Sequence, residues 1–244
     1  MVEPDTPVLA APQRVRLAAL VALAVAVVTW DAVAPHVDQL SLWPTVAIIA
    51  AGVMPATLGL ILLALPLWSR RRWIIVAGVA FGIAAVASWE LNSHLASNFA
   101  KLGAYTSAGW AFLWLFEEFS WVLIVALIIP FVDAISVAAG PTKAIVNHHF
   151  EVYSAVAVAF LGPGGVAADL GPPDILFFAL FLASTVRWRL RPWWTWLAMT
   201  GMYSLTLVIA NLADINGLPA LPFLSFGFLV ANADLLWRRF RPAR

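Results

Sequence analysis

The chain has 244 residues, of which 63% are hydrophobic and 11% are charged, and its formal net charge at pH 7 is +1. Soluble domains carry about 25% charged residues, so this composition excludes an ordinary soluble domain and predicts an all-α, polytopic membrane protein, because apolar helices of about 20 residues match the bilayer core. The near-neutral charge argues against a nucleic-acid partner, and the absence of cysteine excludes disulfides, a thiol nucleophile and thiolate metal sites.

The predicted elements follow one another without an internal repeat or a linker. Residues 1–13 are Pro-rich and polar, and we expect a disordered N-terminal tail there. N-terminal transmembrane helices are predicted in 14–117 and a second transmembrane core in 118–244. The apolar runs predict membrane-spanning helices at 17–35, 45–68, 73–92, 119–139, 174–187, 193–212 and 219–237, with a weaker candidate at 100–117.

The placement of arginine tests the number of helices. All twelve arginines fall in four clusters, at 14/16, 70–72, 187–191 and 238–244. Basic loops stay in the cytoplasm, so an even number of helices has to separate clusters that lie on the same side. Counting 100–117 as a helix satisfies this rule and gives eight helices, within a range of 7–9, with Glu117 and Glu118 at an inner turn. The alternative is seven helices, with one basic cluster outside.

Two carboxylates interrupt the apolar sequence of the second half. Asp133 lies six residues before the end of the predicted helix 119–139, and Asp174 opens the next predicted helix in "GPPDILFFALFL". These helices run in opposite directions because the connection 140–173 joins the end of one to the start of the other. Both acids therefore lie toward the same face of the membrane. Two carboxyls that meet can share a proton and act as general acid and base.

Each acid also has an interpretation that does not involve catalysis. Asp174 follows two prolines, and aspartate is favourable at a helix N-terminus, so Asp174 taken alone is better explained as a cap. Asp133 lies within a helix with no basic residue nearby except Lys143, and a proton relay or ion site is its second functional interpretation.

Other polar residues are less informative. His148, His149 and Glu151 lack the spacing of a zinc motif, and we predict no metal and no cofactor. Asp31 lies near the end of a predicted helix, where a carboxylate reaches water at little cost. Asn232 is expected to form a hydrogen bond between helices.

The sequence around both acids resembles the presenilin and signal peptide peptidase family of intramembrane aspartyl proteases, and the chain looks like a prokaryotic homologue. The segment "FVDAISVAAGPTKAIV" is similar to the family's first catalytic motif at Asp133 to Val137 and again at Thr142-Lys143. Gly171 and Asp174 match the first and last residues of the family's G-x-G-D motif. The Pro-Ala-Leu motif of the family's last helix is present as Pro219, Ala220 and Leu221. The motifs occur in the family's order, and the similarity covers about 119–238.

The resemblance implies a presenilin-like helix bundle that hydrolyses peptide bonds of transmembrane helices within the lipid bilayer. It implies that Asp133 and Asp174 are catalytic and that Gly171, Pro219, Ala220 and Leu221 bind substrate. The expected partner is a transmembrane helical peptide or protein, and the expected location is the cell membrane of a bacterium or archaeon.

The sequence departs from the family at two positions. Val132 replaces a tyrosine, and Pro173 replaces the second glycine of G-x-G-D and removes a backbone donor. Three alternatives stay open: a membrane protease related to prepilin peptidases, which lack the Pro-Ala-Leu motif; a non-catalytic relative; and a proton or ion transporter that uses the same acids.

Overall fold

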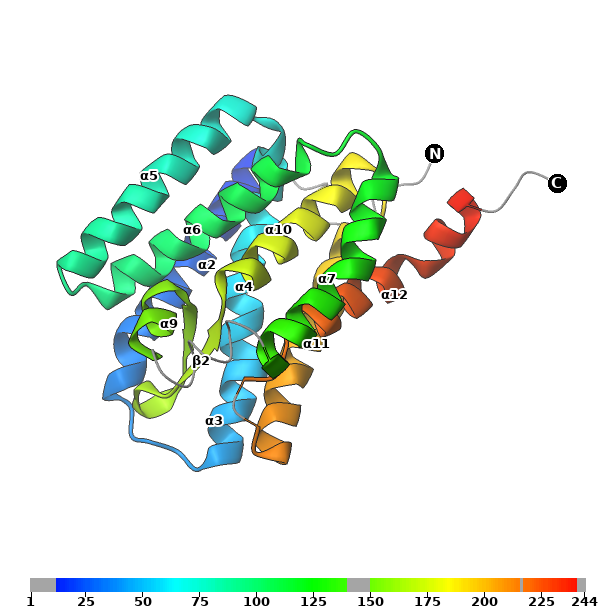
Figure 1. Cartoon of the computed structure of the whole chain (residues 1–244). Coiled ribbons are helices and arrows are strands. Elements are labelled where there is room, and N and C mark those ends of the chain that lie inside the picture. Colours follow the sequence, from blue (N-terminus) through cyan, green and yellow to red (C-terminus); the bar gives the residue numbers. More distant parts are fainter. Residues whose placement is uncertain (1–11, 140–149, 216, 241–244) are drawn as a thin grey trace.

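The computed structural model describes residues 12–139, 150–215 and 217–240 and is predominantly helical (Figure 1). Within these residues, a helix lies at each of the eight predicted positions, including the weak candidate at 100–117. The helices are α2 (Gln13–Val33), α3 (Leu42–Ile48) continuing into α4 (Met54–Ala64), α5 (Arg71–Glu90), α6 (His94–Leu113), α7 (Phe119–Ala139), α10 (Pro172–Arg187), α11 (Pro192–Ala213) and α12 (Leu221–Phe240). The all-α class is therefore confirmed. The predicted disordered tail falls almost entirely outside the described residues.

Five of the described helical segments are long and apolar enough to cross a membrane. They are Gln13–His36, Leu42–Ser69, Arg71–Glu90, Phe119–Val137 and Pro192–Ala213. The segment Leu42–Ser69 is continuous through a π-helical turn at Ile49–Val53. Pro55 follows this turn and has no N–H for the helical ladder, which gives a physical reason for the irregular turn at this place. The finding fits a multi-pass membrane protein.

The helix α10 lies at the centre of the bundle and is short, with 16 residues. Its side chains from Phe178 to Ala183 are fully buried. Phe178 stacks on Tyr203 of α11, and Phe181 stacks on Phe228 of α12 with ring centroids 4.7 Å apart. A helix enclosed by other helices is apolar on every side, which is the pattern that the sequence shows here.

A glycine allows α6 to approach α10 closely. A Cβ atom at Gly109 would lie 2.2 Å from the backbone oxygen of Leu176 and 3.1 Å from Cβ of Ala179. Only glycine fits at such a distance. Gly109 therefore fixes the position of the first half of α10, which carries Asp174.

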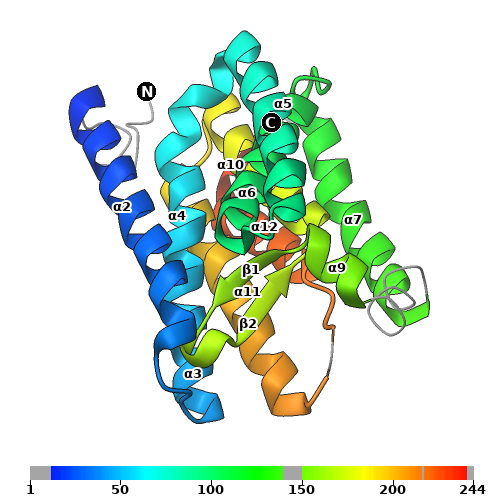
Figure 2. The ribbon, with the colours of Figure 1, turned by 90° about the vertical axis from the view of Figure 1, so that its left-hand side faces the viewer.

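The connection between α7 and α10 was expected to be a loop, and this expectation is wrong for its second part. Residues 150–170 form the short helix α9 (Phe150–Val156) and an antiparallel hairpin of β1 (Val158–Leu161) and β2 (Ala167–Leu170). Figure 2 shows the hairpin extending from α2 toward α9 and the end of α7. The strand β2 leads directly into α10, so the hairpin lies next to Asp174.

Described arginines from all four basic clusters lie at one end of the bundle (Figure 2). Arg71 stacks over Trp114 at the end of α6, and the guanidinium of Arg187 donates to the backbone oxygen of Leu113 at 2.7 Å. Arg239 at the end of α12 stacks over Phe119 at the start of α7. Arg16 and Arg70 line one pocket. The turn that contains Glu117 and Glu118 lies at the same end, between Trp114 and Phe119.

Candidate active site

Asp133 caps a helix other than its own. Its half-buried side chain projects from α7, and Oδ2 accepts a hydrogen bond from the backbone N–H of Leu221 at 3.0 Å. Leu221 is the first residue of α12, and the first N–H groups of a helix have no partner within the helix. The first acid and the Pro-Ala-Leu segment, which are 88 residues apart, are therefore in direct contact.

The last helix begins within the Pro-Ala-Leu segment. The sequence predicts a start at residue 219, but α12 begins at Leu221, so Pro222 lies in its first turn. Proline is compatible with the first turn because its missing N–H would have no partner there. Only Pro219 and Ala220 precede the helix, and Ala220 is buried.

Asp174 caps its own helix. Its Oδ2 accepts from the backbone N–H of Gly171 at 2.9 Å, and its backbone oxygen accepts from the hydroxyl of Tyr203 at 2.9 Å. The capping interpretation therefore describes the geometry of this residue. Gly171 has φ −67° and ψ 164°, which is extended backbone that any residue adopts, and its N–H is already used by Asp174.

The two acids lie close enough to interact electrostatically. The negative charge of Asp133 acts on the Asp174 carboxyl, and both charges act on the hydroxyl of Tyr203. The carboxyls come from α7 and α10, which are joined through α9 and the hairpin. In each carboxyl the capping hydrogen bond uses Oδ2.

Tyr153 on α9 is a residue that sequence reasoning missed. Its hydroxyl donates to the backbone oxygen of Asp169 at 3.5 Å. Burial raises the pKa of the Tyr153 phenol above its ordinary value, and nearby negative charges add to the rise. These charges belong to Asp174, Asp169 and Asp133. The composition contains a signal for this residue, because the chain has 15 Phe and only 3 Tyr, so each tyrosine is a candidate for a role of its hydroxyl.

This tyrosine bears on the departure at Val132. The side chain of Val132 is 53% exposed and so does not take part in the buried surroundings of the acids. Tyr153 brings a phenol hydroxyl to the neighbourhood of the two acids from a different element of the chain.

The outer edge of β1 is closed by side chains. Asn98 of α6 donates to the backbone oxygen of Ala159 and accepts from its N–H, both at 2.8 Å. The indole N–H of Trp30 on α2 donates to the backbone oxygen of Leu161 at 2.7 Å. Asn98 thus pairs with Ala159 as a neighbouring strand would.

The opposite edge of the hairpin belongs to β2. Ala159 is in register with Asp169, and Leu161 with Ala167. Because Ala159 directs its backbone groups to Asn98, the pair with Asp169 is not hydrogen-bonded, and Asp169 directs its own N–H and C=O away from β1. This edge continues into Gly171 and the start of α10.

A second group of polar residues supports the hairpin. Asp31 was expected to reach water, and this is wrong, since it is only 5% exposed and lies 3.4 Å from the amide nitrogen of Asn98. Lys101, also buried, donates to the backbone oxygen of Ser154 at 3.4 Å. Burial raises the pKa of the Asp169 carboxyl, and the positive charge of Lys101 partly offsets the rise. Lys101 lies within 100–117 and lowers the hydropathy of this candidate.

The remaining sequence predictions can be placed as follows. Asn232 is buried and donates to the hydroxyl of Thr195 at 2.8 Å, so the expected bond between helices is confirmed. Within the described residues, no group of three His, Cys, Asp or Glu side chains is arranged to hold a metal ion. Thr142, Lys143, His148 and His149 lie outside the described residues.

The chain matches no protein-family model, and no curated protein or solved structure matches it at a significant level. The functional assignment therefore depends on the geometry given above and on the motifs of the sequence.

Proposed function

We propose that this chain is an intramembrane aspartyl protease that hydrolyses peptide bonds of transmembrane helices, with Asp133 and Asp174 as its acid and base. One observation carries the proposal. The carboxyls of Asp133 on α7 and Asp174 on α10 interact electrostatically. The Asp133 carboxyl also accepts a hydrogen bond from the backbone N–H of Leu221 in the Pro-Ala-Leu segment. Three motifs that are far apart in the sequence thus contribute to one site.

The chemistry requires one carboxylate and one carboxylic acid. The carboxylate removes a proton from a water molecule, whose oxygen attacks the scissile carbonyl carbon, while the protonated partner donates to the carbonyl oxygen. When the tetrahedral intermediate collapses, the C–N bond breaks, the leaving nitrogen takes up the proton that the first carboxyl removed from water, and a hydroxyl of the intermediate returns a proton to the second carboxylate. The hydrogen bonds that each Oδ2 accepts from a backbone N–H hold both carboxyls in place.

The substrate has to present an extended backbone at this site, because the amides of an intact helix are hydrogen-bonded within it. The edge of β2 carries the backbone groups of Ala167 directed away from β1, which suit an added extended segment, whereas the backbone oxygen of Asp169 already accepts from Tyr153. Pro219 and Ala220 lie beside the first acid through the contact of Leu221 with Asp133. Pro173 offers no N–H to such a segment.

The membrane arrangement in this proposal has eight spans, with the basic end in the cytoplasm and the acids toward the outer face. A single cysteine at Val166, in the exposed turn of the hairpin, should react with an impermeant thiol reagent added outside, and one at the exposed Leu115 should react from the cytoplasmic side. The reverse labelling pattern would contradict this orientation. Because the chain has no cysteine, no background has to be removed.

The test of activity is a cleavage assay in liposomes with a panel of single-span peptides. Wild-type protein should produce defined fragments, and Asp133→Asn and Asp174→Asn should each abolish them, because removal of either half of an acid/base pair costs about as much as removal of both. Thermal unfolding of both variants provides the control for folding. Cleavage retained in either variant would remove that residue from the catalytic pair.

Proton transfer is the second candidate function. Beyond the half-buried acid pair, Asp31 and Lys101 are buried and Asp169 is half-buried. Ionisable residues of this kind in membrane proteins are typical of proton pathways. A pH-sensitive dye enclosed in liposomes distinguishes the two functions. Proton flux that requires Asp133 and Asp174, without peptide cleavage, would favour a transporter. If the protein shows neither proton flux nor cleavage, a non-catalytic relative in which both acids are helix caps is favoured.

A further inference from the structure

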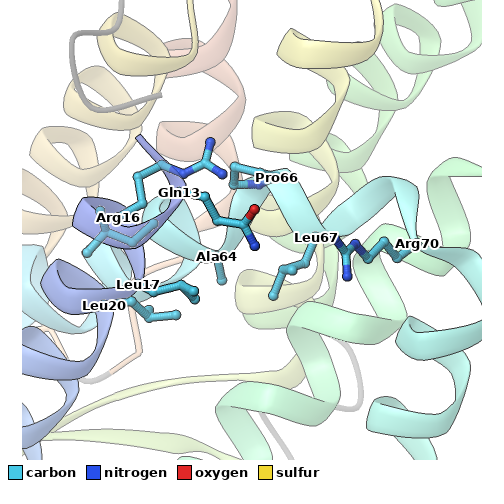
Figure 3. A pocket seen from close by; sticks show the side chains of 9 residues that line it. Gln13, Arg16, Leu17, Leu20, Ala64, Pro66, Leu67 and Arg70 are labelled. Atoms are coloured by element: carbon cyan, nitrogen blue, oxygen red, sulfur yellow. The ribbon is translucent and has the colours of Figure 1, made fainter. Parts of the chain in front are cut away.

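A small pocket lies at the basic end of the bundle (Figure 3). It has a volume of about 90 Å³. Its lining comes from the first turns of α2 and from the end of the segment that contains α4. The lining residues are Gln13, Arg16, Leu17, Leu20, Leu63, Ala64, Pro66, Leu67 and Arg70.

The pocket combines two cations with apolar walls. Arg16 comes from α2 and Arg70 from the residue that precedes α5, so two segments each contribute one guanidinium. Figure 3 shows the Gln13 amide among the aliphatic side chains of the pocket. Leu17 and Leu67 are 47% and 40% exposed, which leaves an apolar surface beside the charges.

The position of the pocket narrows the class of ligand. Both arginines belong to the clusters that gather at one end of the bundle, where phosphate groups of the bilayer would lie. The walls continue toward the middle of the bundle through Leu20 and Leu63, along the contact between α2 and α4. A ligand that fills this shape has an anionic head and a hydrocarbon tail.

We propose that this pocket is a binding site for an acidic phospholipid. Arg16 and Arg70 hold the phosphate, Gln13 donates to a headgroup oxygen, and an acyl chain covers Leu17 and Leu67. A guanidinium group binds phosphate oxygens in a two-pronged geometry, and basic pockets between membrane helices bind anionic headgroups.

The experiment measures lipid binding to the delipidated full-length protein. Native mass spectrometry in detergent compares phosphatidylglycerol with phosphatidylcholine of the same acyl chains. Wild-type protein should retain phosphatidylglycerol preferentially. The affinity for this lipid should fall about fivefold for each arginine that is removed, so the double variant Arg16→Gln/Arg70→Gln should bind it at least tenfold more weakly. The double variant with Lys at both positions keeps the charge and should recover part of the affinity.

A matched control exists in the same two clusters. Arg14→Gln/Arg72→Gln removes the same charge from residues that do not line the pocket, and it should leave the affinity within about twofold of wild type. An equal loss in the control pair would show that general electrostatic attraction, and not this pocket, binds the lipid. Equal binding of phosphatidylcholine would also overturn the proposal.

A competition arm distinguishes a lipid from a soluble anion. Inorganic phosphate and glycerol phosphate carry the charge but no acyl chain, and neither should displace phosphatidylglycerol at concentrations at which the lipid saturates the site. Displacement by either compound at such concentrations would mean that the pocket is an anion site without lipid selectivity. None of these outcomes depends on proteolytic activity.

Discussion

The side chain of Asn98 stabilises the hairpin, and its replacement by alanine gives a quantitative prediction. The change removes both partners of the Ala159 backbone, the donor to its oxygen and the acceptor of its N–H, each at 2.8 Å. A buried backbone group left without a partner costs about 1–3 kcal/mol. Ala159 is half-buried, so water partly compensates, and we expect Asn98→Ala to lower the free energy of unfolding by about 2–4 kcal/mol.

The assay combines a global and a local measurement in detergent. Denaturant unfolding followed by tryptophan fluorescence reports the total loss of stability. Hydrogen–deuterium exchange over 158–170 reports the hairpin, where the amide of Ala159 should exchange faster because its acceptor is gone. Asn211→Ala is the matched control, since Asn211 donates only to the backbone oxygen of Leu207 in its own helix. Its loss of stability should stay below about 0.5 kcal/mol, because alanine is also the better helix former.

A loss of less than about 0.5 kcal/mol for Asn98→Ala, with unchanged exchange over 158–162, would refute the reasoning. It would mean that the edge of β1 does not need the side-chain partner, and that the hairpin is held by its own ladder. A loss equal to that of the Asn211 variant would lead to the same conclusion.

Three further predictions follow from the site and its supports. Asp133→Asn should have a free energy of unfolding within about 0.5 kcal/mol of wild type, because the amide oxygen still accepts from Leu221. Asp133→Ala should lower the free energy of unfolding by about 1–3 kcal/mol in the same denaturant titration, and equal stabilities of the two variants would argue against this cap. Gly109→Ala should lower the melting temperature in a thermal scan, since its Cβ meets the α10 backbone at 2.2 Å, whereas Gly82→Ala, with nothing within 4 Å, should leave it unchanged or raise it. Pro173→Gly should keep the helical circular dichroism of wild type but change the rate or position of peptide cleavage, as mass spectrometry of the products can show; identical products at identical rates would mean that substrate does not pair with this turn.

The sequence by itself determined the class of protein and the positions of the helices. Apolar runs and arginine clusters are local properties, and they placed a helix even at 100–117, where apolarity alone was weak. The same reasoning put Asp133 and Asp174 at one face, because a chain that crosses between two antiparallel helices brings the end of one to the start of the other. The resemblance of the segments around Asp133, Asp174 and Pro219 to known motifs also belongs to this level, since such motifs are short and ordered along the chain.

Only the tertiary structure decided which groups meet. The bond between Asp133 and Leu221, the pairing of Asn98 with Ala159 and the approach of Tyr153 to the acids join residues far apart in the chain, and no periodicity encodes such contacts. Asp31 shows the reason most clearly: its position near a helix end predicted contact with water, but α6 and β1 cover that end and bury it. Burial depends on what packs over a residue, and that is fixed by the whole fold and not by the neighbours of the residue in the sequence.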